Sequence, residues 1–429
     1  MAGTAPISQQ PGPERTSGYG WAVFALSFGL LMSDHMARQV LNAVGPQLTA
    51  EWSLSNAELA SLSSVVALAV GLLTLPLSLA ADRYGRVRSL VAMATLWSLA
   101  TLAGAMAQSY QQMLLARLMV GVGEAAYGSV GIAVVLAVFP VRLRSTLASA
   151  FLAGSIFGQI LGVALGAQVA AVHGWRAAFL AIGLAGLVLA LVYPLVVRED
   201  RIGTTQARAP IAWRSLAHQL LGRRLLLQIY FASGIQLFCT GTMAVFLPLL
   251  LTRHYAMPLA EAGQTTAAFL LVCAVGMVLC GALVDRLARN DPGRKPAVAI
   301  VYSLLSAALF AAAFFNPPGP VQLSLIAAAL LVVAGVAGVC GAMTANLTPP
   351  AIHSTAMALL ALSNNLLGLA PGPYITGLLA DRYDLLFALK VLPLPCLLSA
   401  LAMLAARRDY WRLMMADQEV ERVAGIEPA

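Results

Sequence analysis

The sequence predicts an all-α membrane protein built from twelve transmembrane helices. Apolar residues make up 60% of the 429 residues and charged residues only 10%, whereas a soluble domain carries about 25% charged residues. The mean hydropathy is +0.82, so the lipid bilayer must be the main solvent. A helix needs about 20 mostly apolar residues to cross a bilayer, and twelve such runs follow one another along the chain. They cover approximately residues 19–44, 56–80, 88–108, 112–138, 146–172, 176–197, 225–251, 264–288, 297–315, 321–346, 354–380 and 385–406.

Positive charges are concentrated in every second loop between these runs. The basic loops contain Arg83, Arg86 and Arg88, then Arg142 and Arg144, and then the segments 198–224, 286–295 and 407–412. The loops between them, such as 108–112 and 316–320, have no Lys or Arg. Basic residues favour the cytoplasmic side of a membrane, so both termini are predicted to be cytoplasmic, which requires an even number of helices. This distribution also explains the net charge of +8 without a nucleic-acid partner.

The chain is expected to consist of two six-helix bundles with polar segments around them. The predicted segments are a disordered cytoplasmic N-terminus (1–18), an N-terminal bundle (19–197), a cytoplasmic linker (198–224), a C-terminal bundle (225–406) and a cytoplasmic tail (407–429). Residues 213–221 of the linker are predicted to form a short helix on the membrane surface. The two bundles also repeat in sequence, because the Asp82-Arg83 turn after the second run recurs as Asp285-Arg286 after the eighth. Parallel six-helix repeats are typical of transporters that bind substrate near the midplane, between the repeats.

The first of these turns carries a resemblance to a known family. Residues 78–86 read Ser-Leu-Ala-Ala-Asp-Arg-Tyr-Gly-Arg, which resembles the Gly-x-x-x-Asp-Arg/Lys-x-Gly-Arg loop of the major facilitator superfamily. Ser78 replaces the usual glycine, and Gly281 keeps it in the second copy. The resemblance extends from Tyr19 to Arg408. It implies two bundles that rock in alternating access, with this loop closing the cytoplasmic side.

A narrower resemblance lies in the fourth run. Residues Arg117 to Tyr127 read Arg-Leu-Met-Val-Gly-Val-Gly-Glu-Ala-Ala-Tyr, which is similar to the Spinster-type branch, whose members are linked to lysolipid, sphingolipid or other amphipathic substrates. That branch has adjacent Asp and Arg residues in helix one, whereas Asp34 and Arg38 are one turn apart here. Related organic-anion symporters share parts of the pattern. The substrate class is therefore left open between these groups.

Four charged residues lie inside apolar runs of the first half: Asp34, Arg38, Arg117 and Glu124. A charge at the centre of a bilayer costs roughly 2.5–3.5 kcal/mol on insertion scales, so such residues usually have partners or a function. Asp34 and Arg38 share a helix face at i,i+4, and helices one and four are neighbours in the superfamily. We therefore predict one neutral cluster, in which Glu124 or Asp34 carries the coupling proton. Arg38 or Arg117 would then bind an anionic head group. The alternative is a structural ion-pair network between the two helices.

Two further sets of residues are candidates for function. Polar side chains are costly in contact with lipid, so those within the runs are predicted to bind substrate or to pack between helices. These candidate substrate-binding residues are Tyr127, Gln159, Gln236, Asn364 and Asn365. The charges at the repeated turns are predicted to gate the cytoplasmic side, or else only to set the topology. They are Asp82, Arg83, Arg86, Asp285 and Arg286. Asp82 in particular is expected to accept hydrogen bonds from the start of helix eleven near Ser354, where free N–H groups attract an anion.

Glycine and proline positions complete the prediction. Gly154, Gly158, Gly162 and Gly166 form a stripe for close packing of helix five, and residues 368–374 predict a bend in helix eleven. Helix five lacks the Gly-Pro motif that is usual in proton-driven drug antiporters of the superfamily.

The sequence thus predicts a monomeric, proton-coupled secondary transporter of an amphipathic or organic anion in a bacterial inner membrane. A proton gradient replaces any cofactor, no metal site is expected, and the partners are a small molecule and the bilayer. A multidrug/proton antiporter of the same fold is the first alternative. A membrane-embedded enzyme is the second, although the five cysteines have no metal or redox spacing and no nucleophile or nucleotide motif is present.

Overall fold

The structure is a computed structural model that describes residues 18–140, 143–202, 223–289, 291–349 and 352–423. Its described part is almost entirely helical, and ten of its helices are long and apolar enough to cross a membrane. The expected first and eleventh runs correspond to α1 and to the interrupted helix α14–α15, which are not among those ten. The predicted surface helix at 213–221 lies outside the described residues.

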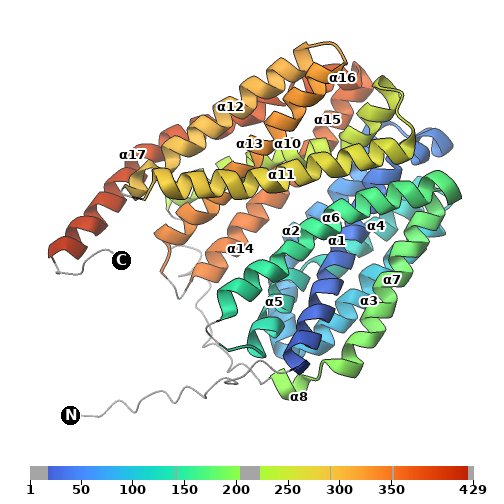
Figure 1. Cartoon of the computed structure of the whole chain (residues 1–429), viewed down its shortest axis with the longest axis horizontal. Helices are drawn as coiled ribbons and strands as arrows, with labels where there is room; N and C mark the ends of the chain where they lie inside the picture. Colours follow the sequence, from blue (N-terminus) through green and yellow to red (C-terminus); the bar gives the residue numbers. More distant parts are fainter. Residues whose placement is uncertain (1–17, 141–142, 203–222, 290, 350–351, 424–429) are drawn as a thin grey trace.

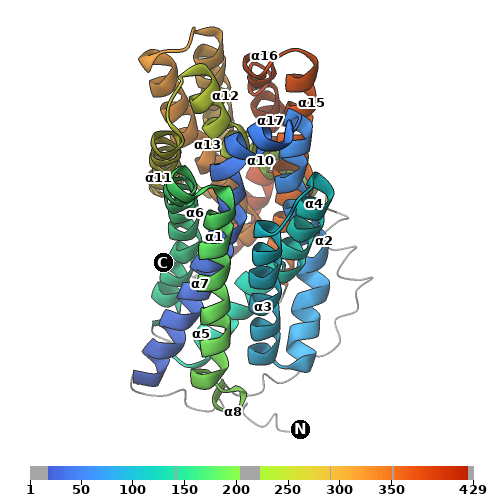
Figure 2. The same ribbon diagram turned by 90° about the vertical axis from the view of Figure 1, so that its right-hand side faces the viewer.

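The N-terminal bundle contains the first eight helices (Figure 1). They are α1 (Gly18–Trp52), α2 (Asn56–Tyr84), α3 (Arg86–Ala105), α4 (Tyr110–Glu124), α5 (Tyr127–Ala137), α6 (Arg144–His173), α7 (Trp175–Val196) and the short α8 (Glu199–Ile202). Gly85 has a φ of +103°, which glycine adopts without strain, and so it joins α2 to α3 in a tight turn. Helices α1, α3 and α7 run side by side, as Figure 2 shows.

The C-terminal bundle follows residue 222 of the chain. Its elements are α10 (Arg224–His254), α11 (Leu259–Leu287), the 3₁₀ turn η2 (Pro292–Arg294), α12 (Lys295–Phe315), α13 (Pro320–Leu347), α14 (His353–Ser363), the π-helical turn η3 (Asn364–Leu369), α15 (Pro371–Arg382), α16 (Leu385–Leu389) and α17 (Pro393–Val423). The predicted bend is present, because helix eleven is interrupted by η3 and restarts at Pro371, which has no N–H to donate. Helix α17 continues through Val423, so the part of the expected tail that the structure describes is helical.

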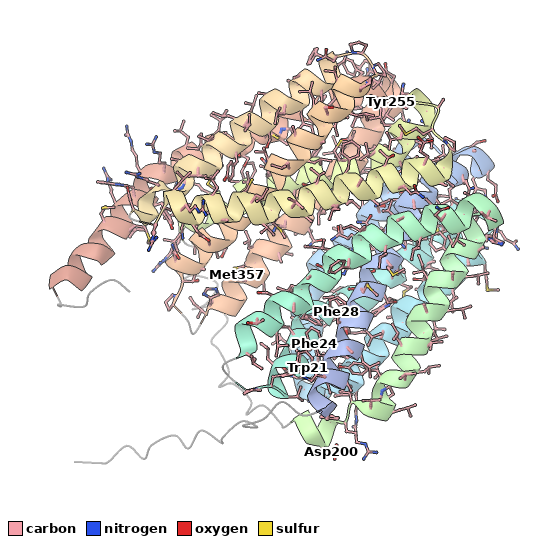
Figure 3. All side chains as sticks on the ribbon, in the orientation of Figure 1. Trp21, Phe24, Phe28, Asp200, Tyr255 and Met357 are labelled. Carbon is pink, nitrogen blue, oxygen red and sulfur yellow. The ribbon has the colours of Figure 1, made fainter. Side chains whose placement is uncertain are left out.

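The long helices end at two opposite faces of the molecule. The terminal face is the end where Gly18, Gly85 and Leu347 lie, and the distal face is the end where Trp52, Gly174 and Gly319 lie. Figure 1 shows the two bundles close together at the distal face and diverging toward the terminal face. In Figure 3, Tyr255 marks the distal face and Asp200 the terminal face.

Side-chain packing supports this arrangement at the distal face. Leu59 and Ala60, in the first turns of α2, are buried in a hydrophobic cluster made mostly by the C-terminal bundle. Gly263 of α11 lies directly against Ala167 of α6, so close that a side chain at this glycine would not fit. The bundles are therefore packed together in the distal half of the molecule.

The glycine stripe of α6 packs closely against another helix as predicted, and that helix is α1. A Cβ atom at Gly162 would lie 2.8 Å from the Cα of Met36, and one at Gly158 would lie 2.8 Å from the Cβ of His35. Gly154 and Gly166 face Phe28 and Ala43 in the same way. These glycines bring the backbones of α1 and α6 close together, which positions the part of α1 that carries the buried charges.

The expected fourth run forms one span from Tyr110 to Ala137, but a short break divides this span into two helices. Helix α4 ends at Glu124 and α5 begins at Tyr127, with a turn at Ala125 and Ala126. Gly121 and Gly123 bring the last turns of α4 into backbone contact with α2 and α3 respectively. The break therefore lies where α4 is wedged between its neighbours, and it places Glu124 at the end of a helix inside the bundle.

Candidate functional site

The centre of the candidate site is an ion pair between α1 and α4. Nε of Arg38 donates to Oε2 of Glu124 over 3.1 Å. The Glu124 side chain is only 3% exposed, whereas that of Arg38 is 26% exposed. The arginine is thus the accessible partner, and the carboxylate lies behind it. An exchange of partners at Arg38 can therefore link an external anion to the charge state of Glu124.

Arg117 is fully buried and contacts the backbone of α1. Its Nη1 donates to the carbonyl oxygen of Ala37 over 2.7 Å, and its Nη2 donates to that of Arg38 over 2.9 Å. Its Nε has no hydrogen-bond partner among the described residues. Arg117 therefore joins α4 to α1 at the residue that holds the ion pair, and it lies further from solvent than Arg38 does.

Asp34 is buried next to this pair but is not joined to Arg38. The two residues share a face of α1 as expected, but Arg38 turns to Glu124, and no ion pair joins it to Asp34 within the described chain. Oδ2 of Asp34 lies 3.6 Å from Nδ1 of His35, and that Nδ1 also lies 3.1 Å from the carbonyl oxygen of Leu31. The Asp34 carboxyl lies near that of Glu124.

The two acids together make a site that can hold a proton. Oδ1 of Asp34 and Oε1 of Glu124 are buried and have no donor among the described residues. A buried acceptor without a donor is costly, and two carboxylates side by side repel each other. A single proton shared by Asp34 and Glu124 removes both penalties. Two of the four predicted charges thus lie where they can share one proton, and Arg38, which contacts Glu124, is their more accessible neighbour.

Tyr127 and Gln159, two predicted substrate-binding residues of the N-terminal bundle, lie in different surroundings. Tyr127 is fully buried, donates from its hydroxyl to the carbonyl oxygen of Ser27 over 2.9 Å, and packs its ring edge-on against Trp97. Gln159 is half-buried and accepts a 3.5 Å hydrogen bond from Gln39 of α1. In this state Tyr127 thus has a packing contact, and Gln159 belongs to a polar contact between α1 and α6.

The polar contact continues through residues that the sequence analysis did not single out. Nδ2 of Asn42 donates to Gln39 over 2.7 Å, and the hydroxyl of Ser63 donates to Asn42 over 2.8 Å. A polar row therefore crosses from α6 through α1 to α2, just distal to Arg38. Gln39 and Asn42 lie at i+1 and i+4 from Arg38 within an apolar run, and this signal was available in the sequence.

The C-terminal bundle supplies amides without charges. Gln236 is buried, its Nε2 lies 3.7 Å from Sγ of Cys396, and its Oε1 has no partner among the described residues. Asn364 accepts from the hydroxyl of Ser233 over 2.7 Å. Asn365 donates to Ala361 over 2.9 Å and keeps a buried oxygen without a partner. Both asparagines lie in the π-helical turn, a feature that often occurs at functional sites.

The predicted gating residues lie at the terminal face. Asp82 is 60% exposed and forms an ion pair of 2.9 Å with Arg86, four residues along. Arg83 lies over the ring of Tyr84 at 5.7 Å. The carboxylate of Asp82 is thus held by its own loop, and the side chain of Ser354, its expected partner region, is outside the described residues. Asp285 and Arg286 are exposed at the end of α11.

Two carboxylates that cap helices were missed in the sequence analysis. Glu199 of α8 accepts hydrogen bonds from the backbone N–H groups of Arg86 and Val87, each over 2.8 Å, and so caps α3. Asp381 at the end of α15 caps the start of α2 in the other bundle. For Asp381 a signal existed, because residues 378–383 repeat the Leu-x-Ala-Asp-Arg-Tyr pattern of residues 79–84.

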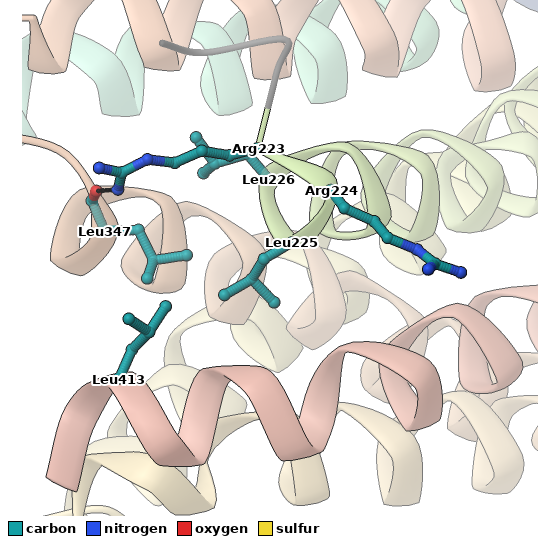
Figure 4. A pocket seen from close by; sticks show the side chains of 6 residues that line it. All are labelled: Arg223, Arg224, Leu225, Leu226, Leu347 and Leu413. Atoms are coloured by element: carbon teal, nitrogen blue, oxygen red, sulfur yellow. Dashed lines mark hydrogen bonds between the residues drawn. The ribbon is translucent and has the colours of Figure 1, made fainter. Parts of the chain in front are cut away.

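Two other features lie apart from the buried charges. Trp21, Phe24 and Phe28 follow one another along the terminal half of α1, with neighbouring ring centroids 5.9 Å apart (Figure 3). A cavity of about 310 Å³ opens where α10 begins at the terminal face, and Figure 4 shows it. The residues that line it are Arg223, Arg224, Leu225, Leu226, Leu347 and Leu413. Within the described residues, no group of three His, Cys, Asp or Glu side chains is placed to hold a metal.

Known proteins resemble this chain along most of its length. The family model described as Major Facilitator Superfamily matches residues 26–340 and, in a second match, residues 229–412. A gallate transporter from Pseudomonas putida is 28% identical over 426 residues, which cover 90% of this chain and 92% of that protein. Human protein spinster homolog 1 is 25% identical over 408 residues, which cover 88% of this chain and 76% of that protein.

Solved structures resemble it as well. A bacterial homolog of the human lysosomal transporter Spinster, in an inward-facing and unoccupied conformation, has a TM-score of 0.83 and 18% sequence identity, over 93% of this chain and 99% of that one. The predicted resemblance to the superfamily and to its Spinster-like branch is confirmed by these matches.

Proposed function

The chain belongs to the Major Facilitator Superfamily of transporters, and we propose that it moves an organic anion across a bacterial inner membrane together with a proton. One observation carries the proposal: Arg38 pairs with Glu124, whose carboxyl lies beside that of Asp34 with buried oxygens left over on both acids. A site of this kind exchanges an internal carboxylate for an external one when a proton arrives.

The proposed coupling step is an exchange of partners at Arg38. When Glu124 is ionised, it occupies the guanidinium group and competes with any substrate anion. When the proton enters the Asp34–Glu124 pair, Glu124 becomes neutral and Arg38 is free to bind the anion, with its planar fork of donors suited to a carboxylate. Anion and proton thus bind together, and the loaded site gains no net charge. Arg117 holds the backbone of α1 in place while the pair exchanges.

The proposed substrate is an organic acid of moderate size with an apolar or aromatic body. The N-terminal bundle offers the cation, whereas the C-terminal bundle offers amides and apolar side chains around Gln236 and Asn365. The similarity to a gallate transporter supports a carboxylate on an aromatic ring.

The proposed topology has twelve crossings. It adds α1 and the interrupted helix α14–α15 to the ten helices that are long and apolar enough on their own. An even number puts both ends of the chain on one side, and the arginine-rich loops favour the cytoplasm for the terminal face. The described state would then be open to the cytoplasm. We propose that a single chain performs transport, without a cofactor.

Transport by the purified protein in liposomes tests the proposal. A pH-sensitive dye inside the liposomes reports protons, while labelled gallate, a lysolipid and a cationic dye are offered in turn. We expect gallate or a related acid to enter with protons, and we expect Glu124→Gln and Asp34→Asn to uncouple the two flows. Glu261→Gln is the matched control, because Glu261 is exposed at the start of α11. Uptake of cations alone would contradict the proposal and would support the multidrug antiporter.

A further inference from the structure

Helices α2 and α14–α15 run in opposite directions and end in nearly the same six residues. Helix α2 ends in Leu79-Ala80-Ala81-Asp82-Arg83-Tyr84, and α15 leads into Leu378-Leu379-Ala380-Asp381-Arg382-Tyr383. The two helices lie side by side, one in each bundle. The local geometry also repeats, since Arg83 lies 5.7 Å from the ring of Tyr84 and Arg382 lies 5.8 Å from that of Tyr383.

At the distal face the second copy is engaged with the partner helix. Oδ1 of Asp381 accepts from the backbone N–H of Asn56 over 2.7 Å and from its side-chain Nδ2 over 2.8 Å. Oδ2 accepts from the backbone N–H of Ala57 over 2.9 Å. Arg253 of α10 donates to the side-chain oxygen of Asn56 over 3.0 Å. One carboxylate of the C-terminal bundle thus holds the first two residues of α2.

These two N–H groups are the ones that α2 cannot satisfy by itself. Ser55 and Glu58 form a capping box, in which the Ser55 hydroxyl accepts from the N–H of Glu58 and the Glu58 carboxylate accepts from the N–H of Ser55. A helix start leaves its first N–H groups without internal partners. The box satisfies the first and the last of these four donors from within the N-terminal bundle, and Asp381 of the other bundle satisfies the two between them.

The close approach of the backbones requires a glycine at this contact. A Cβ atom at Gly377 would lie 2.7 Å from the carbonyl oxygen of Asn56 and 2.8 Å from the Cα of Ala57. Gly377 lies four residues before Asp381, one turn along α15, so it faces the same helix start. Asp381 therefore reaches the N–H groups only when the distal halves of the bundles are in contact.

At the terminal face no contact joins Asp82 to the start of α14 among the residues that the structure describes. Asp82 forms its ion pair with Arg86 of its own loop, and the bundles diverge toward this end. Helix α14 begins at this end at His353, so its first N–H groups lie at the face where Asp82 lies, and Ser78 stands where the distal copy has Gly377.

We propose that Asp381 on the start of α2 is a latch that holds the distal face closed in this state and releases it in the alternate state. It uses a carboxylate on free helix N–H groups, a contact favoured by the helix dipole. It opposes the contact that the family resemblance implies between Asp82 and the start of helix eleven, because the two contacts lie at opposite ends of the same pair of helices. The latch depends on the alternating access of the proposed function. Its test measures the conformation of the protein and not transport.

Distances between spin labels on the full-length protein in lipid nanodiscs test the latch. One pair of labels replaces Gln108 and Pro318, which are exposed at the distal ends of the two bundles. A second pair replaces Arg88 and Arg408 at the terminal face. The unsubstituted protein reports background labelling of the native cysteines, of which Cys273 alone is not fully buried. Each pair is measured with Asp381→Ala, Asp82→Ala and the control Asp384→Ala, whose carboxylate caps α16 within its own bundle.

The latch predicts opposite shifts from the two substitutions. Asp381→Ala should lower the ratio of distal-closed to distal-open molecules about tenfold, which corresponds to about 1.4 kcal/mol and is the size expected for loss of a helix cap. Asp82→Ala should raise that ratio, and Asp384→Ala should leave it unchanged. Equal effects of Asp381→Ala and Asp384→Ala would overturn the latch, and so would a shift of the same sign from Asp82→Ala. If Asp381→Ala fails to fold, Asp381→Asn keeps the shape and must give a smaller shift of the same sign.

Discussion

Replacing Glu124 by glutamine should make anion binding tight and independent of pH. In the proposed exchange, an ionised Glu124 occupies Arg38 through the 3.1 Å contact, so an incoming anion must first displace it. A hydrogen bond to a charged group contributes about 1.5–3 kcal/mol, which corresponds to roughly 10- to 150-fold in affinity. Glutamine keeps the shape of the side chain but holds the guanidinium group more weakly. At alkaline pH the variant should therefore bind the transported acid more tightly than the wild type by about this factor.

The measurement is a binding titration in nanodiscs at several pH values. For the wild type we expect the affinity to fall about tenfold per pH unit once Glu124 ionises, because each anion then requires a proton. For Glu124→Gln the affinity should be flat over the same range. Glu261→Gln should follow the wild type. A Glu124→Gln curve that keeps the wild-type slope would refute the partner exchange, and weaker binding at every pH would show that Glu124 only supports the structure.

Two further predictions concern stability. Gly158→Leu should lower the melting temperature, because even the Cβ atom of the new side chain would lie 2.8 Å from the Cβ of His35 and overpacking costs about 1–3 kcal/mol. Gly128→Ala is the control, because Gly128 has open space around it. Equal melting temperatures of the two variants would contradict the packing of α6 on α1. Glu199→Ala should lower the free energy of unfolding by about 1 kcal/mol, because it removes the cap of α3. Asp200→Ala, which changes the exposed neighbouring residue, should leave the free energy of unfolding unchanged. Chemical denaturation of the two variants compares these values.

The sequence was most informative where a short-range pattern has one packing solution. The glycine stripe of α6 could be predicted because residues spaced by four share a helix face, and its contact with α1 followed. The interruption of helix eleven could be predicted from Pro371 and its neighbouring glycines. The grouping of Arg38 with Glu124 could be predicted because a charged residue inside an apolar helix usually has an oppositely charged partner.

Other features depended on contacts that no local pattern contains. The break after Glu124 falls at Ala125 and Ala126, two good helix formers, because neighbouring helices and not the local residues determine it. The sequence left open which acid pairs with Arg38, since Asp34 at i,i+4 spacing on α1 competes with a carboxylate from α4. Asp381 accepts a hydrogen bond from Asn56, which is far from it in the sequence. The repeated Leu-x-Ala-Asp-Arg-Tyr pattern was the sequence signal that indicated a role for Asp381.

Proton uptake on anion binding is the most direct test of the coupling between Arg38, Glu124 and Asp34. The purified protein in weakly buffered solution near neutral pH is mixed with the acid that it transports, and a pH indicator follows the solution. If the anion takes the place of Glu124 on Arg38, about one proton should leave the solution for each anion bound, and Glu124→Gln should abolish this uptake while still binding the anion. Binding without any proton uptake by the wild type, or equal uptake by Glu124→Gln, would contradict proton coupling at this site.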